Sequence, residues 1–258
     1  MHRRDRRRQG KLPGPRVRAT VLALALLAAG ALASTAHPAT RLTIYGASSL
    51  TNAFPALDRG ERYSFAASSA LETQIRNGAP ADLFASASPL NTQRLFRDGY
   101  VEKPVAFTAN RLALIVPKDN PADIHSVYDL GRKPVNLVVA GAAVPVGSYT
   151  RTVLRKLGLS TVLSKVVSEE TDARAVTGKV ALGQADAGFV YVTDARSVAD
   201  RVSVIRIPDR AQPRVRYEIA VVSKSSKKAA AHAWIKKLLS KKGQAVLERF
   251  GFLPLPAA

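Results

Sequence analysis

Residues 62–85 read RYSFAASSALETQIRNGAPADLFA, which predicts a strand, a helix and a second strand in that order. The segment RYSFA at 62–66 predicts a strand. The residues after it predict a helix, because Leu71 and Ile75 lie one helical turn apart. A second buried strand is predicted at 82–85. A strand, a helix and a strand in succession are the unit from which parallel sheets are built, so the stretch indicates an α/β protein.

The same alternation continues on both sides of this stretch. Upstream, RLTIY at 41–45 predicts a strand that leads into the turn and helix start GASSLTNAF. Further strands are predicted downstream at 112–116, 135–140, 162–167, 187–191, 202–207 and 217–222, with one long helix from 227 to 250. We therefore expect a largely parallel sheet. Since no Gly/Ser-rich linker is present, a chain with two lobes would cross between them through ordered segments, for which the runs at 112–116 and 217–222 are the natural candidates.

Residues 1–36 have the layout of an export signal. Eight basic side chains precede an apolar run of 15 residues at 19–33, and Ala31-Leu32-Ala33 provides a small-x-small cleavage site. That run is shorter than the roughly 20 residues of a spanning helix, although an uncut leader is the alternative. The chain has no cysteine, so we expect neither disulfides nor a lipoprotein anchor. The predicted location is the periplasm or the exterior of the cell envelope.

The chain is strongly basic, with a formal net charge of +20, of which the leader carries +7 and the remainder +13. An excess of basic residues is typical of proteins that bind nucleic acid, an acidic membrane surface or anionic solutes. Export argues against a nucleic-acid partner. Steering of anions and attachment to an acidic envelope are both open as explanations.

Two predicted strand-to-helix turns are rich in hydroxyl and small side chains: GASSLT at 46–51 and AASSA at 66–70. Such a turn exposes backbone N–H groups at a helix N-terminus, where the helix dipole and a nearby hydroxyl favour an anion. The alternative for either turn alone is ordinary N-capping, for which Ser and Thr are common.

The second half of the chain offers matching features. VPVGSY at 144–149 and TDAR at 171–174 are further helix starts, and the strand at 187–191 ends in the hydroxyl of Tyr191. A buried tyrosine usually finds a partner in the core, but this one lies at a strand end, where α/β proteins place ligands. Together, the two halves indicate one anion site built from both.

Enzyme chemistry is poorly supported. Two of the four histidines lie in or beside the leader, and neither His125 nor His232 is near a serine turn. No phosphate-binding loop, dinucleotide fingerprint or metal-binding cluster is present. The acidic group Glu169, Glu170 and Asp172 is expected to supply first-turn helix charges. We therefore predict neither an enzyme nor a cofactor. An esterase-like serine hydrolase is the alternative from another class.

Four segments, GASSLTNAF, SFAASSALETQIRNGAPADLF, VPVGSYT and AGFVYVTDA, in this order and spacing, resemble the molybdate-binding periplasmic proteins of bacterial molybdate ABC transporters. The similarity extends over residues 41–252. It implies the type II periplasmic-binding-protein fold, an α/β fold with two lobes joined by two crossover segments. The implied division is 37–116 with 217–258 as lobe 1 and 117–216 as lobe 2.

The resemblance also implies the residues that contact the oxyanion. They are the serines Ser49, with Ser48 as the register alternative, and Ser68, the backbone donors at Val146 and Ala173, and the hydroxyl of Tyr191. Val146 is bulkier and Ala173 smaller than the residues expected there, so the cavity wall differs in detail.

The implied function is that of an exported substrate-binding protein that captures molybdate, and tungstate, through neutral donors and delivers it to a membrane permease. We expect a monomer. The alternative is a binding protein of the same fold for sulfate or a small organic anion. Because every group in the site donates, a protonated oxyanion such as hydrogen phosphate should be rejected.

Overall fold

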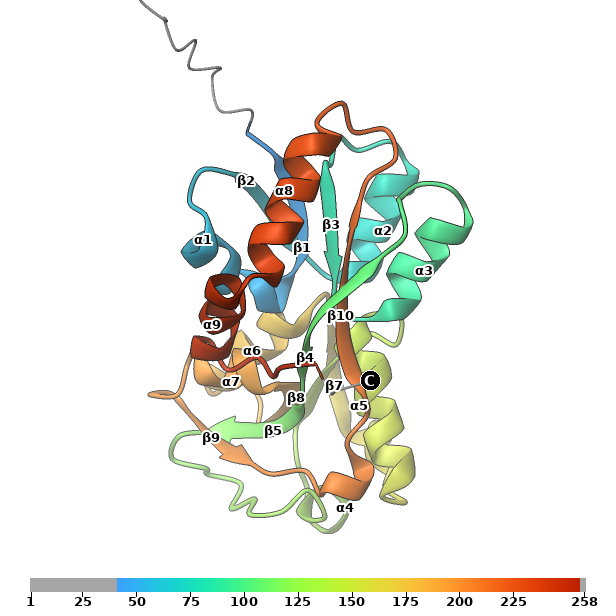
Figure 1. Ribbon diagram of the computed structural model, residues 1–258. Helices are drawn as coiled ribbons and strands as arrows, with labels where there is room; N and C mark the ends of the chain where they lie inside the picture. Colours follow the sequence, from blue (N-terminus) through green and yellow to red (C-terminus); the bar gives the residue numbers. More distant parts are fainter. Residues whose placement is uncertain (1–40, 256–258) are drawn as a thin grey trace, which may run out of the picture. The chain divides into compact units, whose positions relative to one another are not determined.

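The computed structural model describes residues 41–255, which form two five-stranded sheets with helices packed against them (Figure 1). The α/β class is confirmed. Within the described residues, no helix is both long and apolar enough to cross a membrane. The predicted export signal at 1–36 lies outside the described residues.

The first sheet has the strand order β2-β1-β3-β10-β4. Its strands are β1 (Thr43–Ala47), β2 (Arg62–Ala66), β3 (Leu83–Ser86), β4 (Val105–Asn110) and β10 (Val215–Val221). Strands β2, β1 and β3 are parallel, and β10 runs antiparallel to both β3 and β4. The three parallel strands therefore end at the same edge, where the serine turns begin.

The second sheet repeats this plan with the order β7-β6-β8-β5-β9. Its strands are β5 (Leu112–Pro117), β6 (Leu137–Ala140), β7 (Val166–Glu170), β8 (Ala187–Tyr191) and β9 (Val202–Ile205). Strands β7, β6 and β8 are parallel, and β5 runs antiparallel to β8 and β9. The prediction of a largely parallel sheet was therefore wrong, because two of the four strand pairings in each of the two sheets are antiparallel.

The chain passes between the two sheets twice. Arg111 alone separates β4 of the first sheet from β5 of the second, and residues 206–214 lead from β9 back to β10. The run at 112–116, expected with the first lobe, pairs only within the second sheet. Each sheet thus contains an inner antiparallel strand, β5 or β10, that follows directly from a passage between the sheets.

The helices and 3-10 turns are η1 (Ser48–Leu50), α1 (Ala53–Leu57), α2 (Ser68–Arg76), α3 (Pro89–Arg97), α4 (Asp129–Arg132), α5 (Pro145–Lys156), η2 (Ser160–Lys165), α6 (Ala173–Ala181), α7 (Val192–Arg196), η3 (Asp209–Ala211), α8 (Lys228–Leu239) and α9 (Lys241–Arg249). Two predictions need correction. Most of the run at 162–167 forms η2, and β7 begins only at Val166. The predicted helix from 227 to 250 is two helices, because Ser240 is extended and its Oγ accepts a hydrogen bond from the N–H of Gly243, which caps α9.

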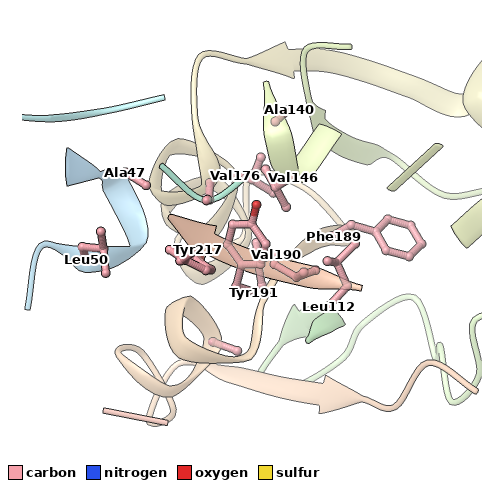
Figure 2. Packing of buried hydrophobic residues seen from close by; sticks show 14 of the residues in the cluster. Ala47, Leu50, Leu112, Ala140, Val146, Val176, Phe189, Val190, Tyr191 and Tyr217 are labelled. Atoms are coloured by element: carbon pink, nitrogen blue, oxygen red, sulfur yellow. The ribbon is translucent and has the colours of Figure 1, made fainter. Parts of the chain in front are cut away.

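The buried apolar residues form two clusters, and the larger one includes side chains from both sheets. At its centre, the ring of Tyr217 packs edge-on against Phe107, Tyr191 and Phe252, with ring centroids 5.4–6.0 Å apart. Figure 2 shows Tyr191 and Tyr217 together, with Ala47 and Val146 close by. Close packing holds these rings in fixed positions, which matters because Tyr191 also reaches a cavity.

Candidate functional site

A small cavity lies where helix starts from both sheets meet. Its lining comes from Ala47, Ser48, Ser49, Ala66, Ala67, Ser68, Ala87, Val144, Pro145, Val146, Ala173 and Tyr191. Its volume is about 10 Å³, so the two walls are close together. All five residues predicted to contact an anion, and the alternative Ser48, line this one cavity. Their contact with an anion stays a prediction.

Ser49 lies in η1, the turn that follows β1 of the first sheet. Its side chain is buried, and its Oγ is 2.8 Å from the hydroxyl oxygen of Tyr217. Ser48 precedes it in the same turn and also lines the cavity. The end of β1 therefore places the Ser49 hydroxyl at the cavity, and the hydroxyl of Tyr217, which does not line the cavity, holds it in position.

Ser68 is the first residue of α2, which follows β2. It is buried, and its Oγ accepts a hydrogen bond from the backbone N–H of Ala87 at 3.0 Å. A hydroxyl that accepts from the protein still has one proton to donate. Since no side chain caps α2, the first N–H groups of that helix are also free of a side-chain partner.

Two helices of the second sheet present their N-termini to the same cavity. In α5 no side chain caps the first turn, and the first N–H groups of a helix have no intrahelical partner, so the N–H of Val146 is available. In α6 the Asp172 carboxylate accepts from the N–H groups of Arg174 and Ala175. That carboxylate leaves the N–H of Ala173 unclaimed. Both predicted backbone positions therefore carry an available donor.

Glycine is required at the start of α5. A Cβ on Gly147 would collide with the backbone oxygens of Ala140 and Gly141, at the end of β6. Without that Cβ, the helix starts directly against the strand end. This close approach sets the position of the Val146 N–H relative to the cavity.

Tyr191, at the end of β8, contributes a hydroxyl that lacks a partner. The side chain is buried, and its oxygen has no hydrogen-bond partner among the described residues. Burial, with a smaller contribution from neighbouring Tyr217, raises the pKa of Tyr191 well above its ordinary value, so the hydroxyl keeps its proton. A buried donor without a partner is costly, and this one lines the cavity.

The cavity lining of the described chain includes no ionisable side chain other than Tyr191. The nearest buried carboxyl to that tyrosine is Asp194, whose Oδ2 accepts from the Tyr191 N–H at 3.3 Å. Burial raises the pKa of Asp194 to about 7. The site therefore offers N–H and O–H groups and no formal positive charge.

The acidic group at 169–172 does not act as expected. Glu169 and Glu170 belong to β7, where they pair with Arg151 and Lys179, and only Asp172 is at a helix start, as the N-cap of α6. The prediction of three first-turn charges was wrong because β7 extends to Glu170. The two glutamates are instead neutralised by basic partners.

The histidines of the described chain lie away from the cavity. His125 is exposed and pairs with Asp123, and His232 is exposed and pairs with Glu102. No group of three or more residues able to bind a metal ion is found among residues 41–255. Cavity serines without a neighbouring base are donors rather than activated nucleophiles.

Two residues of the site were missed by sequence reasoning. Tyr217 contacts Ser49 across a separation of 168 residues, and Asn110 donates to the Tyr217 hydroxyl from the strand that precedes the first crossing. No local pattern in the sequence indicates either residue, since Tyr217 is simply the first residue of a predicted strand at 217–222. Both depend on which strands are neighbours in the first sheet.

The fold and the cavity define a class of protein. The chain belongs to the family of bacterial extracellular solute-binding proteins, whose family model, "Bacterial extracellular solute-binding protein", matches residues 61–253. The relatives that match 73% or more of this chain are described as molybdate-binding proteins or as an ABC transporter substrate-binding lipoprotein, in agreement with the prediction that the chain is not an enzyme.

Within that class, the chain is similar to the molybdate-binding protein ModA of Mycobacterium tuberculosis, with 35% identity over 223 residues, which are 82% of this chain and 84% of the relative. The predicted resemblance to molybdate-binding proteins is thereby confirmed.

Two solved structures share the fold. The periplasmic molybdate-binding protein of Azotobacter vinelandii aligns with a TM-score of 0.74 at 20% identity, over 84% of this chain and 100% of that one. The sulfate-binding protein SubI of Mycobacterium tuberculosis aligns with a TM-score of 0.70 at 19% identity, over 83% of this chain and 87% of that one. The predicted periplasmic-binding-protein fold is confirmed.

Proposed function

We propose that this chain is the exported substrate-binding protein of an ABC transporter and that it captures molybdate, and tungstate, in the cavity between the two sheets. The ligand contacts are the hydroxyls of Ser49, Ser68 and Tyr191 and the backbone N–H groups of Val146 and Ala173. The similarity to molybdate-binding relatives supports the choice of ligand.

The unpartnered hydroxyl of Tyr191 carries this proposal. A buried O–H without an acceptor costs about 1–3 kcal/mol, and here it belongs to a cavity that also holds two serines and two available helix N–H groups. A bare dianion supplies the missing acceptors for all of them at once. Each bond to a charged acceptor contributes about 1.5–3 kcal/mol, so several together give tight capture.

Selectivity for a fully deprotonated anion follows from the direction of the hydrogen bonds, which the protein donates and the anion accepts. A fully deprotonated tetrahedral anion accepts from every group in the site, whereas hydrogen phosphate carries an O–H that needs an acceptor. The side chains that line the cavity include none that is purely an acceptor. Discrimination between molybdate and the smaller sulfate then rests on cavity size.

Calorimetry with molybdate, tungstate, sulfate and phosphate on the purified protein tests this function. Molybdate and tungstate should bind far more tightly than phosphate. Phosphate binding equal to or better than molybdate binding would overturn the proposal.

Binding and closure are coupled in this scheme. A cavity of about 10 Å³ admits little more than one water, so the walls must separate for a tetrahedral anion to enter. One wall belongs to the first sheet and the other to the second, and the chain joins them only at Arg111 and at 206–214. We therefore place the lobe division at these crossings, with 41–110 and 215–255 in lobe 1, instead of at the predicted 116 and 217.

Delivery requires a membrane permease as the partner, and the protein acts as a monomer without a nucleic-acid partner. The leader pattern at 1–36 supports export, and the lack of cysteine supports a product without a lipid anchor. Fractionation of cells that express the full chain tests this assignment. A leader-free product in the periplasmic or secreted fraction is expected, and an intact leader in the membrane fraction would contradict it.

Sulfate is the second candidate ligand. The small cavity and the bulkier Val146 in its wall favour a compact tetrahedral anion. In the calorimetric series, sulfate binding tighter than molybdate binding would select this alternative.

A further inference from the structure

A chain of buried polar side chains ends on Ser49. The Asn110 Nδ2 lies 3.3 Å from the Tyr217 hydroxyl oxygen, and that oxygen lies 2.8 Å from the Ser49 Oγ. All three side chains are buried, and only Ser49 lines the cavity. The direction in which each hydrogen bond runs decides what Ser49 can offer there.

The orientation of the first group in the chain is fixed by the backbone. The N–H of Arg111 lies 2.9 Å from the Oδ1 of Asn110, and a backbone N–H can only donate, so the amide oxygen must face it. The amide nitrogen therefore faces the other way, toward the hydroxyls of Tyr217 and Thr193. Asn110 donates to Tyr217.

The second link follows from proton counting. The Tyr217 oxygen accepts from Asn110 and has one proton of its own, for which Ser49 is the one partner within reach among the described residues. The opposite direction would leave a buried tyrosine proton without an acceptor, which is unfavourable. Tyr217 therefore donates to Ser49, and the proton of Ser49 is directed to the cavity.

We propose that Tyr217 and Asn110 are positioning residues that hold Ser49 as a donor toward the cavity and so set the preference for a fully deprotonated oxyanion over one that carries a hydrogen. This inference rests on the proposed function. The Tyr217 ring is held for that task by edge-on contacts with three aromatic rings. The β10–β4 register shifts between Tyr217 and Glu218, and such irregularities redirect side chains.

The decisive variant is Tyr217→Phe, measured by calorimetry with molybdate and with phosphate at several pH values. Without the tyrosine proton, the Ser49 oxygen regains a free lone pair and its hydroxyl can turn. Molybdate affinity should fall about 2- to 12-fold, the range for one neutral hydrogen bond. The ratio of molybdate affinity to phosphate affinity should fall by a larger factor. Asn110→Ala provides a second route to the same change and should narrow the ratio in the same direction.

A double-mutant cycle with Ser49→Ala separates positioning from a general structural effect. If Tyr217 acts through Ser49, Tyr217→Phe has little further effect on molybdate affinity once Ser49 is alanine. Tyr63→Phe is the matched control, because its hydroxyl donates to the backbone oxygens of Asp58 and Phe54 and Tyr63 does not line the cavity. That control should leave the affinity ratio unchanged.

The outcomes are distinguishable. Equal losses from Tyr217→Phe in the parent and in the Ser49→Ala background, or an unchanged molybdate-to-phosphate ratio, would overturn this inference and leave the proposed function standing. A parent protein that binds none of molybdate, tungstate, sulfate and phosphate would overturn both.

Discussion

Replacing Tyr191 by phenylalanine should make the protein more stable and a worse binder at the same time. The substitution removes one oxygen from a buried ring and nothing else. That oxygen has no partner among the described residues, so its removal relieves a penalty of about 1–3 kcal/mol in the ligand-free protein. For a domain of about 150–250 residues, each 1 kcal/mol raises the melting temperature by roughly 2–4 °C.

The same oxygen is proposed to donate to the anion, so its loss removes one charge-assisted bond. A bond of about 1.5–3 kcal/mol corresponds to a roughly 10- to 150-fold weaker molybdate affinity. Thermal unfolding without ligand and calorimetry with molybdate measure the two effects separately.

Tyr63→Phe is the control, because the Tyr63 hydroxyl donates to two backbone oxygens. It should lower the melting temperature and leave the affinity as it is. A Tyr191→Phe protein with a lower melting temperature and parental affinity would show that the hydroxyl serves only the core.

Three further predictions concern neighbouring groups. Ser68→Ala should weaken molybdate binding by roughly 10- to 150-fold. It should also lower stability by about 1–3 kcal/mol, because the buried N–H of Ala87 loses its acceptor. Calorimetry and thermal melts of the control Ser69→Ala should match the parent. Burial raises the pKa of Asp194 from an ordinary 3.8 to about 7, so the folded state keeps this proton at pH values where the unfolded state has lost it. The free energy of unfolding of the parent should therefore fall relative to that of Asp194→Asn as pH rises from 4 to 7, by up to ~4 kcal/mol. Denaturation experiments that show no change of this difference with pH would refute the prediction. Gly147→Ala should destabilise the protein by about 1–3 kcal/mol and weaken binding because α5 must move, while Gly178→Ala, whose Cβ would meet nothing within 4 Å, should be neutral or stabilising in the same assays.

Local features of the site could be predicted from the sequence because they depend on short stretches. Serines after a strand and small residues before a helix place Ser49, Ser68 and Val146 at helix starts whatever the rest of the chain does. The meeting of these residues in one cavity was predicted from the matching turns in the two halves of the chain and from the resemblance. Tyr191 was included because it lies at the end of a strand, where α/β proteins place ligands.

Other features depend on partners far away in the chain. The antiparallel places of β5 and β10 are set by sheet order, which hydrophobic patterning does not encode. The link between Tyr217 and Ser49 follows from that order alone. The break at Ser240 was hidden because apolar spacing continues on both sides of it, and a serine in such a run reads equally well as part of a helix.

The position of β10 has a consequence for biosynthesis. This strand lies between β3 and β4, yet it comes from residues 215–221, more than a hundred residues after β4. A ribosome must therefore deliver nearly the whole polypeptide before the first sheet can close, and contacts so distant in sequence form slowly. Because the chain completes its first sheet this late, it remains unfolded during most of its synthesis, and an unfolded chain can pass through a narrow secretion pore.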